Sequence, residues 1–90
     1  MNEPLLWQMI GATRGGPTRL GILLVLSEEP LNANQLSEIM KLDYKTVRHH
    51  LDILVKNGLI YTSKQKKYGE LYCVHDFVKK KVRELNLGKL

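Results

Sequence analysis

The sequence predicts a mainly α-helical domain that carries one small β-hairpin. Three observations lead to this fold class. Apolar residues recur at helical spacing along most of the chain, two helix starts are separated by only a tight turn, and two β-prone segments flank a polar, basic loop. With 90 residues, of which 43% are hydrophobic and 26% charged, the chain has the size and composition of one folded domain.

The first two expected helices lie before Pro30. The residues at 15–17, Gly-Gly-Pro, break the helical pattern of residues 4–12. Pro17 suits the first position of a second helix, which is rich in leucine and isoleucine and which we expect to lie mostly in the core. The broad apolar side of the first helix consists of Leu5, Leu6, Met9 and Ile10.

A third helix is expected to begin at Asn32. Asparagine is a good N-cap residue, and Gln35, three positions later, can reach back to complete a capping box. Leu31 is placed to pack against the first turn. The side chains that we expect this helix to bury are Leu36, Ile39 and Met40.

Only Lys41 and Leu42 separate the third helix from a fourth, which is expected to begin with Asp43 as its N-cap. The fourth helix should end at residues 56–58, where Gly58 can take the left-handed conformation beyond a helix end. Two helices joined by a tight turn form a helix-turn-helix. The inner face of the fourth helix should contain Val47, Leu51 and Leu54, with His50 and Ile53 at its edges.

A hairpin and a last helix complete the chain. Residues 59–62 and 71–74 are rich in β-forming residues, and residues 63–69 between them are polar and basic. Residues 76–86 return to helical spacing. Their apolar side consists of Val78, Val82 and Leu85.

The net charge of +5 is concentrated in one part of the sequence. Residues 41–68 contain seven basic and two acidic residues, whereas the rest of the chain is balanced. A one-sided excess of this kind indicates a surface that binds a polyanion.

The start of the fourth helix carries the side chains that we assign to DNA contact. In a helix-turn-helix, the first residues of the second helix enter the major groove, while later apolar residues pack on the first helix. With Val47 and Leu51 facing inward, the helical period turns the neighbouring polar side chains outward. The candidate DNA-binding residues of this helix are Tyr44, Lys45, Thr46, Arg48 and His49.

These side chains have chemistry suited to a duplex. The forked guanidinium of Arg48 can pair with a guanine edge, whereas Lys45 and Thr46 can bond to bases or phosphates. Tyr44 can stack on a sugar or touch a thymine methyl group, and His49 can reach a phosphate. The alternative is an ordinary solvated helix face, but the position directly after a tight turn favours nucleic-acid contact.

Three further lysines, Lys64, Lys66 and Lys67, cluster at the expected hairpin tip. There they can reach across a phosphate backbone or into the minor groove, although a charged tip also simply favours solubility. The turn at residues 14–16 can donate backbone N–H groups to a phosphate, and a plain interhelical turn explains it equally well. Lysines 79–81 are interpreted as a solvated helix face.

No residue pattern indicates catalysis, a cofactor or a metal centre. The sequence contains no phosphate-binding glycine loop, no HExxH motif and no recognisable nucleophile motif, so we expect a protein that is not an enzyme. Adjacent His49 and His50 point about 100° apart on a helix, and we interpret His50 as a packed, hydrogen-bonded histidine.

The cysteine count and the hydropathy pattern bear on the compartment. Cys73 is the single cysteine, and we interpret it as small apolar filler in a strand, with a redox thiol as the alternative. The longest aliphatic run, residues 22–26, is far too short to span a membrane, and no secretion signal precedes it. We therefore expect a soluble cytoplasmic protein.

The segment "NANQLSEIMKLDYKTVRHHLDILVKNGLI" followed by "KYGELYCV" closely resembles archaeal winged-helix transcriptional regulators of the ArsR-like group. The resemblance implies a winged helix-turn-helix with a three-helix core, a recognition helix beginning near Asp43 and a wing at residues 63–70. The resemblance covers roughly residues 15–75, and the chain length predicts a single domain over residues 1–90. The resemblance also implies a dimer that forms through terminal helices, here residues 4–12 and 76–86. The side chains assigned to that contact are Leu5, Met9, Val78, Val82 and Leu85.

The sequence also departs from part of this family. Metal-sensing members carry cysteines in the first helix of the helix-turn-helix, or acidic and histidine ligands in the last helix. Residues 35–41 contain no cysteine, and the last helix offers only His75 and Asp76 near its start, so we do not expect metal sensing. The leading hypothesis is a homodimeric regulator that binds a specific double-stranded DNA sequence; a protein-interaction module built on the same fold is the alternative.

Overall fold

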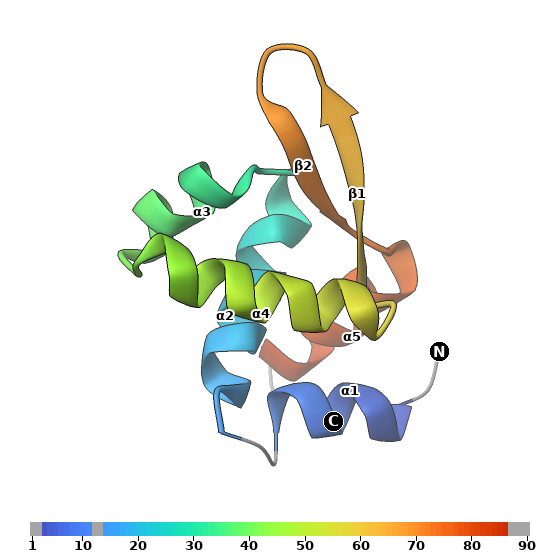
Figure 1. Ribbon diagram of the computed structural model, residues 1–90. Helices are drawn as coiled ribbons and strands as arrows, with labels where there is room; N and C mark the ends of the chain where they lie inside the picture. The colour runs from blue at the N-terminus through green and yellow to red at the C-terminus, as the bar shows by residue number, and fades with distance from the viewer. Residues whose placement is uncertain (1–2, 12–13, 87–90) are drawn as a thin grey trace.

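The computed structural model describes residues 3–11 and 14–86, and within these ranges five helices and one β-hairpin follow one another (Figure 1). This confirms the predicted fold class, mainly α-helical with a small hairpin. The elements in chain order are α1 (Glu3–Ile10), α2 (Gly16–Glu28), α3 (Ala33–Met40), α4 (Tyr44–Lys56), β1 (Ile60–Gln65), β2 (Gly69–Val74) and α5 (Asp76–Asn86).

The boundaries of the first two helices follow local sequence signals. Helix α1 ends at Ile10, and Ala12, where the predicted helix ended, lies outside the described residues. Gly15 forms the N-cap of α2 with a left-handed φ of 84°, a conformation that costs glycine little, and Pro17 follows in the first turn. Helix α2 ends before Pro30, as predicted.

The two helix starts of the helix-turn-helix are confirmed. The side chain of Asn32 accepts a hydrogen bond from the Gln35 N–H, and the Gln35 side chain accepts one from the Asn32 N–H, which completes the capping box. Asp43 caps α4 by accepting from the Thr46 N–H. Between the helices, Lys41 takes a left-handed φ of 56°, and the tight turn is fastened by the Ser37 hydroxyl, which donates to the Leu42 carbonyl at 2.6 Å.

Helix α2 is the centre of the core and contacts α1, α3, α5 and β2 (Figure 1). The interior is filled by aliphatic side chains from every helix and from the hairpin, as expected for a domain with one core. The side chains that are almost fully buried are Ile22, Leu23, Leu26, Leu36, Val47, Leu51, Leu54, Leu59, Ile60, Val78 and Val82. In the same described part of the chain, no helix has the length and apolar character needed to cross a membrane.

One buried position in α3 was predicted wrongly. Ile39 has 54% of its surface exposed, whereas Leu36 is fully buried and Met40 packs partly against the core. At about 100° per residue, Ala33 and Met40 lie on one side of Leu36 around the helix axis, and Ile39 lies on the other side. Only one narrow side of this eight-residue helix meets its neighbours, and that side runs from Leu36 towards Met40 and leaves Ile39 in solvent.

The interpretation of the apolar side of α5 also needs correction. Val78 and Val82 are fully buried within the single chain, where α5 packs on α2, so they are core residues and not free for subunit contact. Met9 and Leu85 pack at the edge of the same core. The side chain of Leu5 lies outside the described part of the chain. The predicted core was too small because it left the terminal helices out.

The hairpin is longer than the sequence predicted. Strands β1 and β2 pair antiparallel from Ile60 opposite Val74 to Gln65 opposite Gly69, so residues 63–65 belong to a strand and only residues 66–68 form the turn. Polar strand ends can pair because the ladder needs only backbone groups, and Lys64 lies opposite Glu70 with favourable charge. The Tyr72 N–H donates to the Leu31 carbonyl at 2.8 Å, which joins the hairpin to the residues before α3.

Candidate nucleic-acid interface

The N-terminal half of α4 presents a polar, cationic surface to solvent. Tyr44 is 44% exposed, and Lys45, Arg48 and His49 are also exposed. Thr46 is half-buried, and its hydroxyl donates to the Asp43 carboxylate at 2.6 Å. This hydrogen bond and the one from the Thr46 backbone hold the pKa of Asp43 below its ordinary value. The helix start is therefore fixed, and four of its five candidate side chains remain accessible.

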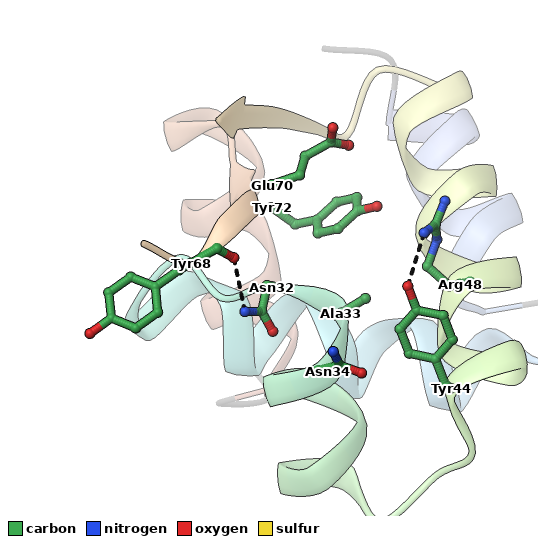
Figure 2. A pocket seen from close by; sticks show the side chains of 8 residues that line it. All are labelled: Asn32, Ala33, Asn34, Tyr44, Arg48, Tyr68, Glu70 and Tyr72. Carbon is green, nitrogen blue, oxygen red and sulfur yellow. Dashed lines mark hydrogen bonds between the residues drawn. The ribbon is translucent and has the colours of Figure 1, made fainter. Parts of the chain in front are cut away.

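Arg48 lies along the surface of α4 between two other side chains of the same helix. Its guanidinium donates to the Tyr44 hydroxyl at 3.1 Å and lies 3.9 Å from a carboxylate oxygen of Asp52 (Figure 2 shows the Tyr44 contact). Both partners are exposed, so these contacts orient the side chain more than they stabilise the fold. Arg48 is held in place without being sequestered.

A recess of about 280 Å³ separates the first turns of α4 from the hairpin (Figure 2). We call it the helix-hairpin recess. Its wall combines the start of α3, the first turns of α4 and strand β2 with the turn before it. The residues that line it are Asn32, Ala33, Asn34, Tyr44, Arg48, Tyr68, Glu70 and Tyr72.

Tyr72 forms the floor of this recess. Its side chain is 4% exposed, and Figure 2 shows its hydroxyl directed towards Arg48. Burial raises the pKa of the Tyr72 hydroxyl above its ordinary value of 10.0, so the group stays protonated at neutral pH. Sequence reasoning assigned Tyr72 only to a strand and Asn32 only to a helix cap. A clue was available, because a buried tyrosine hydroxyl needs a polar environment.

The hairpin lysines are solvent-exposed, as a DNA-contacting tip requires. Lys64 lies on β1, while Lys66 and Lys67 lie in the turn, where the Lys67 ammonium is 5.2 Å from the Tyr68 ring centre. None of the three lines the helix-hairpin recess. Asn32 donates from its side-chain amide to the Tyr68 carbonyl at 3.0 Å and so connects the hairpin turn to α3. Figure 1 shows the hairpin extending beyond the helices, with its tip free.

Beneath α4, His50 is a packed, hydrogen-bonded histidine, as predicted. It is 8% exposed, and its Nδ1 lies 3.3 Å from a guanidinium nitrogen of Arg19, from which it accepts because arginine can only donate. Burial, and secondarily the charge of Arg19, lowers the pKa of His50 below its ordinary value.

Arg19 is the feature of this region that the sequence did not disclose. It lies on the otherwise apolar helix α2 and is only 5% exposed. Its Nε donates to the Met9 carbonyl at 2.6 Å and its Nη2 to the Arg14 carbonyl at 3.2 Å. The turn at residues 14–16 is therefore an interhelical turn fastened from within by Arg19.

The other side chains considered for chemistry have structural environments. Cys73 is buried in β2, which fits its interpretation as apolar filler. Lys79 and Lys81 lie near acidic partners on their own helix, Asp76 and Glu84. Across residues 3–11 and 14–86, no three histidine, cysteine or acidic side chains gather as metal ligands would.

Comparison with known proteins agrees with this geometry. Residues 16–62, from α2 into β1, match the family described as "Bacterial regulatory protein, arsR family". An uncharacterized HTH-type transcriptional regulator of Methanocaldococcus jannaschii, MJ1325, is 34% identical over 70 residues, which are 77% of this chain and 79% of the relative.

Two solved structures share the fold. A crystal structure described as a predicted DNA-binding transcriptional regulator from E. coli has a TM-score of 0.78 at 25% identity, over 96% of this chain and 87% of that protein. The transcriptional regulator HlyU from Vibrio vulnificus has a TM-score of 0.76 at 22% identity, over 98% of this chain and 88% of that protein. The resemblance to regulators with this fold is thereby confirmed.

Proposed function

Because the chain belongs to the ArsR family and is a DNA-binding transcriptional regulator, we propose that it acts as a homodimer that recognises a specific duplex sequence. Regulators with two-fold symmetry bind pseudo-palindromic sites, so each subunit would contact one half-site. The family consists of regulatory proteins, and we assign no enzymatic activity to the chain. We place it in the cytoplasm, where its DNA target would lie.

The observation that carries this proposal is the accessible cationic start of α4. Lys45, Arg48 and His49 are exposed on the helix that follows the tight turn, which is the helix that enters the major groove in helix-turn-helix proteins. The exposed lysines of the hairpin extend the same charge towards the backbone or minor groove. The proposed DNA-binding residues are Tyr44, Lys45, Thr46, Arg48, His49, Lys64, Lys66 and Lys67.

For the dimer, the outer sides of the terminal helices are the candidate contact. Trp7 on α1 is 45% exposed and Phe77 on α5 is 49% exposed, whereas the inner sides of both helices belong to the core. Large aromatic side chains are favoured at the centre of subunit interfaces. We propose one winged helix-turn-helix domain, with residues 4–12 and 76–86 supplying its dimer contacts.

The test begins with selection of bound duplexes from random DNA, followed by fluorescence anisotropy on the preferred site. If Lys45 contacts a base, Lys45→Ala should weaken binding by about 1–3 kcal/mol. If Lys45 contacts the backbone, the slope of log affinity against log salt concentration should become shallower by about 0.9, the value for one phosphate contact. Lys80→Ala is the matched control, because it removes an exposed lysine from α5. Since residues 76–86 are assigned to the subunit contact, sedimentation of this variant verifies that its oligomeric state is that of the wild type.

Two results would contradict the proposal. Equal losses in the two variants would mean that only net charge matters. Selection that yields no preferred sequence, with binding insensitive to salt, would favour a protein-interaction module instead.

A further inference from the structure

The contacts proposed for α4 in the major groove and for the hairpin lysines leave the helix-hairpin recess without a ligand. We propose that it binds one backbone phosphate of the duplex, namely the phosphate between the major groove that α4 enters and the neighbouring minor groove. The inference rests on the proposed function, and it gives Arg48 and Tyr72 a specific ligand.

The Tyr72 hydroxyl is the first group of the recess that suits a phosphate. Within residues 3–11 and 14–86, no group forms a hydrogen bond with this hydroxyl, and Tyr72 as a whole residue is only 4% exposed. The hydroxyl oxygen is not among the buried polar atoms, so it is the part of the side chain that is open to the recess. When the ring of a tyrosine is buried, its hydroxyl normally bonds to a protein group, a water molecule or a ligand. The group points into the recess towards Arg48 (Figure 2). A protonated hydroxyl in this position can donate a hydrogen bond to a group in the recess, and a phosphate oxygen is a strong acceptor.

The start of α3 supplies further donors on the other wall of the recess. The N–H groups of Ala33 and Asn34 are the first two of the helix and have no intrahelical acceptor. Asn32 already caps the third N–H group, that of Gln35, with its side chain. Among the residues that the structure describes, no group accepts a hydrogen bond from either N–H, and the positive end of the helix dipole also favours an anion in front of them.

The side of α4 contributes positive charge to the recess. The Arg48 guanidinium lines the recess and is held there by the Tyr44 hydroxyl. Arg48 has further donors for a phosphate, and its planar fork suits bidentate contact. Glu70 is the acidic residue of the lining and opposes an anion, but it is exposed at the rim and lies opposite Lys64 in the hairpin.

The expected path of the DNA backbone indicates which anion would reach the recess. A second recess of about 260 Å³ shares Arg48, Glu70 and Tyr72 with the first and lies between α4 and the hairpin. Its lining also contains Lys56 and Thr62, and it contains Asp52, whose carboxylate opposes an anion but lies 3.9 Å from the Arg48 guanidinium. The two recesses therefore adjoin along the side of α4 that faces the hairpin. If α4 lies in the major groove and the hairpin lies at the adjacent minor groove, the sugar-phosphate strand that separates these grooves must run between the two elements. A backbone phosphate then faces the Tyr72 hydroxyl.

The test is Tyr72→Phe, which removes the hydroxyl and keeps the buried ring. We expect affinity to fall about tenfold on the preferred duplex and on a scrambled duplex alike, because a phosphate contact carries no sequence information. The slope of log affinity against log salt concentration should stay unchanged in Tyr72→Phe, because the hydroxyl is neutral. In Arg48→Ala the same slope should become shallower by about 0.9.

Two variants serve as controls. Tyr61→Phe removes a hydroxyl from the other face of the hairpin, where Tyr61 is 46% exposed and pairs with Cys73, and it should bind as the wild type does. Glu70→Gln removes the opposing charge and should tighten binding several-fold on both duplexes. Thermal denaturation of each variant checks that the fold is retained.

A methylphosphonate scan locates the contact. In each duplex, one charged phosphate oxygen is replaced by a methyl group. At one position per half-site, the methylphosphonate should lower the affinity of the wild type about as much as Tyr72→Phe lowers affinity for the unmodified duplex. At that position the methylphosphonate should lower the affinity of Tyr72→Phe little further, because both changes remove the same interaction.

The outcomes separate this inference from the proposed function. A wild type that binds no duplex overturns both. Normal duplex binding by a folded Tyr72→Phe variant overturns the inference alone, as does a loss confined to the preferred sequence or additive losses at every methylphosphonate position. Inorganic phosphate that shifts the Tyr72 resonances, combined with unchanged duplex affinity of the variant, would mean a site for a free anion and would also overturn it.

Discussion

Replacing Arg19 by methionine should destabilise the junction between α1 and α2 more than any surface change of the same type. Methionine fills a similar volume but donates no hydrogen bond. The carbonyls of Met9 and Arg14 would then lose a charged donor at 2.6 Å and 3.2 Å, and Nδ1 of His50 would lose its partner at 3.3 Å. The substitution therefore tests whether this buried cation holds the turn and the helix before it.

The expected size follows from two opposing contributions. Each of the two bonds from the charged donor to a carbonyl contributes about 1.5–3 kcal/mol, so their loss costs about 3–6 kcal/mol. Methionine also avoids the desolvation cost of a buried guanidinium, and this offsets part of the loss. We expect a net loss of about 2–3 kcal/mol in the free energy of unfolding, which for a domain of this size lowers Tm by roughly 10–20 °C.

The assay can also localise the effect, because the chain has one tryptophan and it lies on α1. Thermal unfolding would be followed by Trp7 fluorescence and by far-UV circular dichroism in the wild type, in Arg19→Met and in the exposed control Arg83→Met. In Arg19→Met, the fluorescence transition should precede the dichroism transition, because α1 separates first. If Arg19→Met were as stable as the control, the hydrogen bonds of Arg19 would not hold this junction.

Three further predictions concern the cap, the buried histidine and the subunit contact. Asn32→Ser keeps a capping oxygen, so it should stay within about 0.5 kcal/mol of the wild type, while Asn32→Ala should lose about 1 kcal/mol in urea denaturation; equal losses would mean that the cap is not what Asn32 contributes. The folded state resists protonation of His50, so below its ordinary pKa of 6.5 the unfolded state binds more protons and stability falls as pH falls. His50→Gln should have a shallower loss between pH 6.5 and 5 in the same assay, and an unchanged pH profile would exclude His50 as the cause. Phe77→Glu should shift sedimentation from dimer to monomer without unfolding the protein, whereas a wild type that sediments as a monomer would refute the dimer.

Local sequence signals predicted much of this fold. The capping box at Asn32, the N-cap at Asp43 and the glycine that ends α4 depend on residues within a few positions of one another, and each was found where expected. Burial depends on which face meets a neighbour, and that information is not local. For this reason Ile39 was assigned to the core although it is exposed, and Val78 was assigned to a subunit contact although it is buried.

The same distinction applies to the candidate site. The outward side of α4 follows from helical periodicity, so Lys45 and Arg48 could be named from the sequence. The helix-hairpin recess could not, because it joins the start of α3, the first turns of α4 and strand β2, which are brought together by the fold. The buried Arg19 was missed for a related reason: its partners are backbone carbonyls, which leave no pattern in a sequence.

If the recess binds a phosphate, as we propose, the side chains of α4 have different roles in DNA recognition. The sequence favoured Arg48 as the residue that pairs with a guanine edge, but its guanidinium lies beside Tyr44 at the wall of the recess, towards the hairpin. An arginine that contacts the backbone fixes the position of the helix without discriminating between bases. Base contact would then fall to Lys45 and His49, which are exposed and do not line the recess. Two such side chains discriminate weakly within one half-site, so much of the specificity would come from the spacing of two half-sites on a dimer. The protein should accordingly bind a duplex with a single half-site only slightly more tightly than scrambled DNA. A strong preference for an isolated half-site would mean that Arg48 contacts a base edge after all.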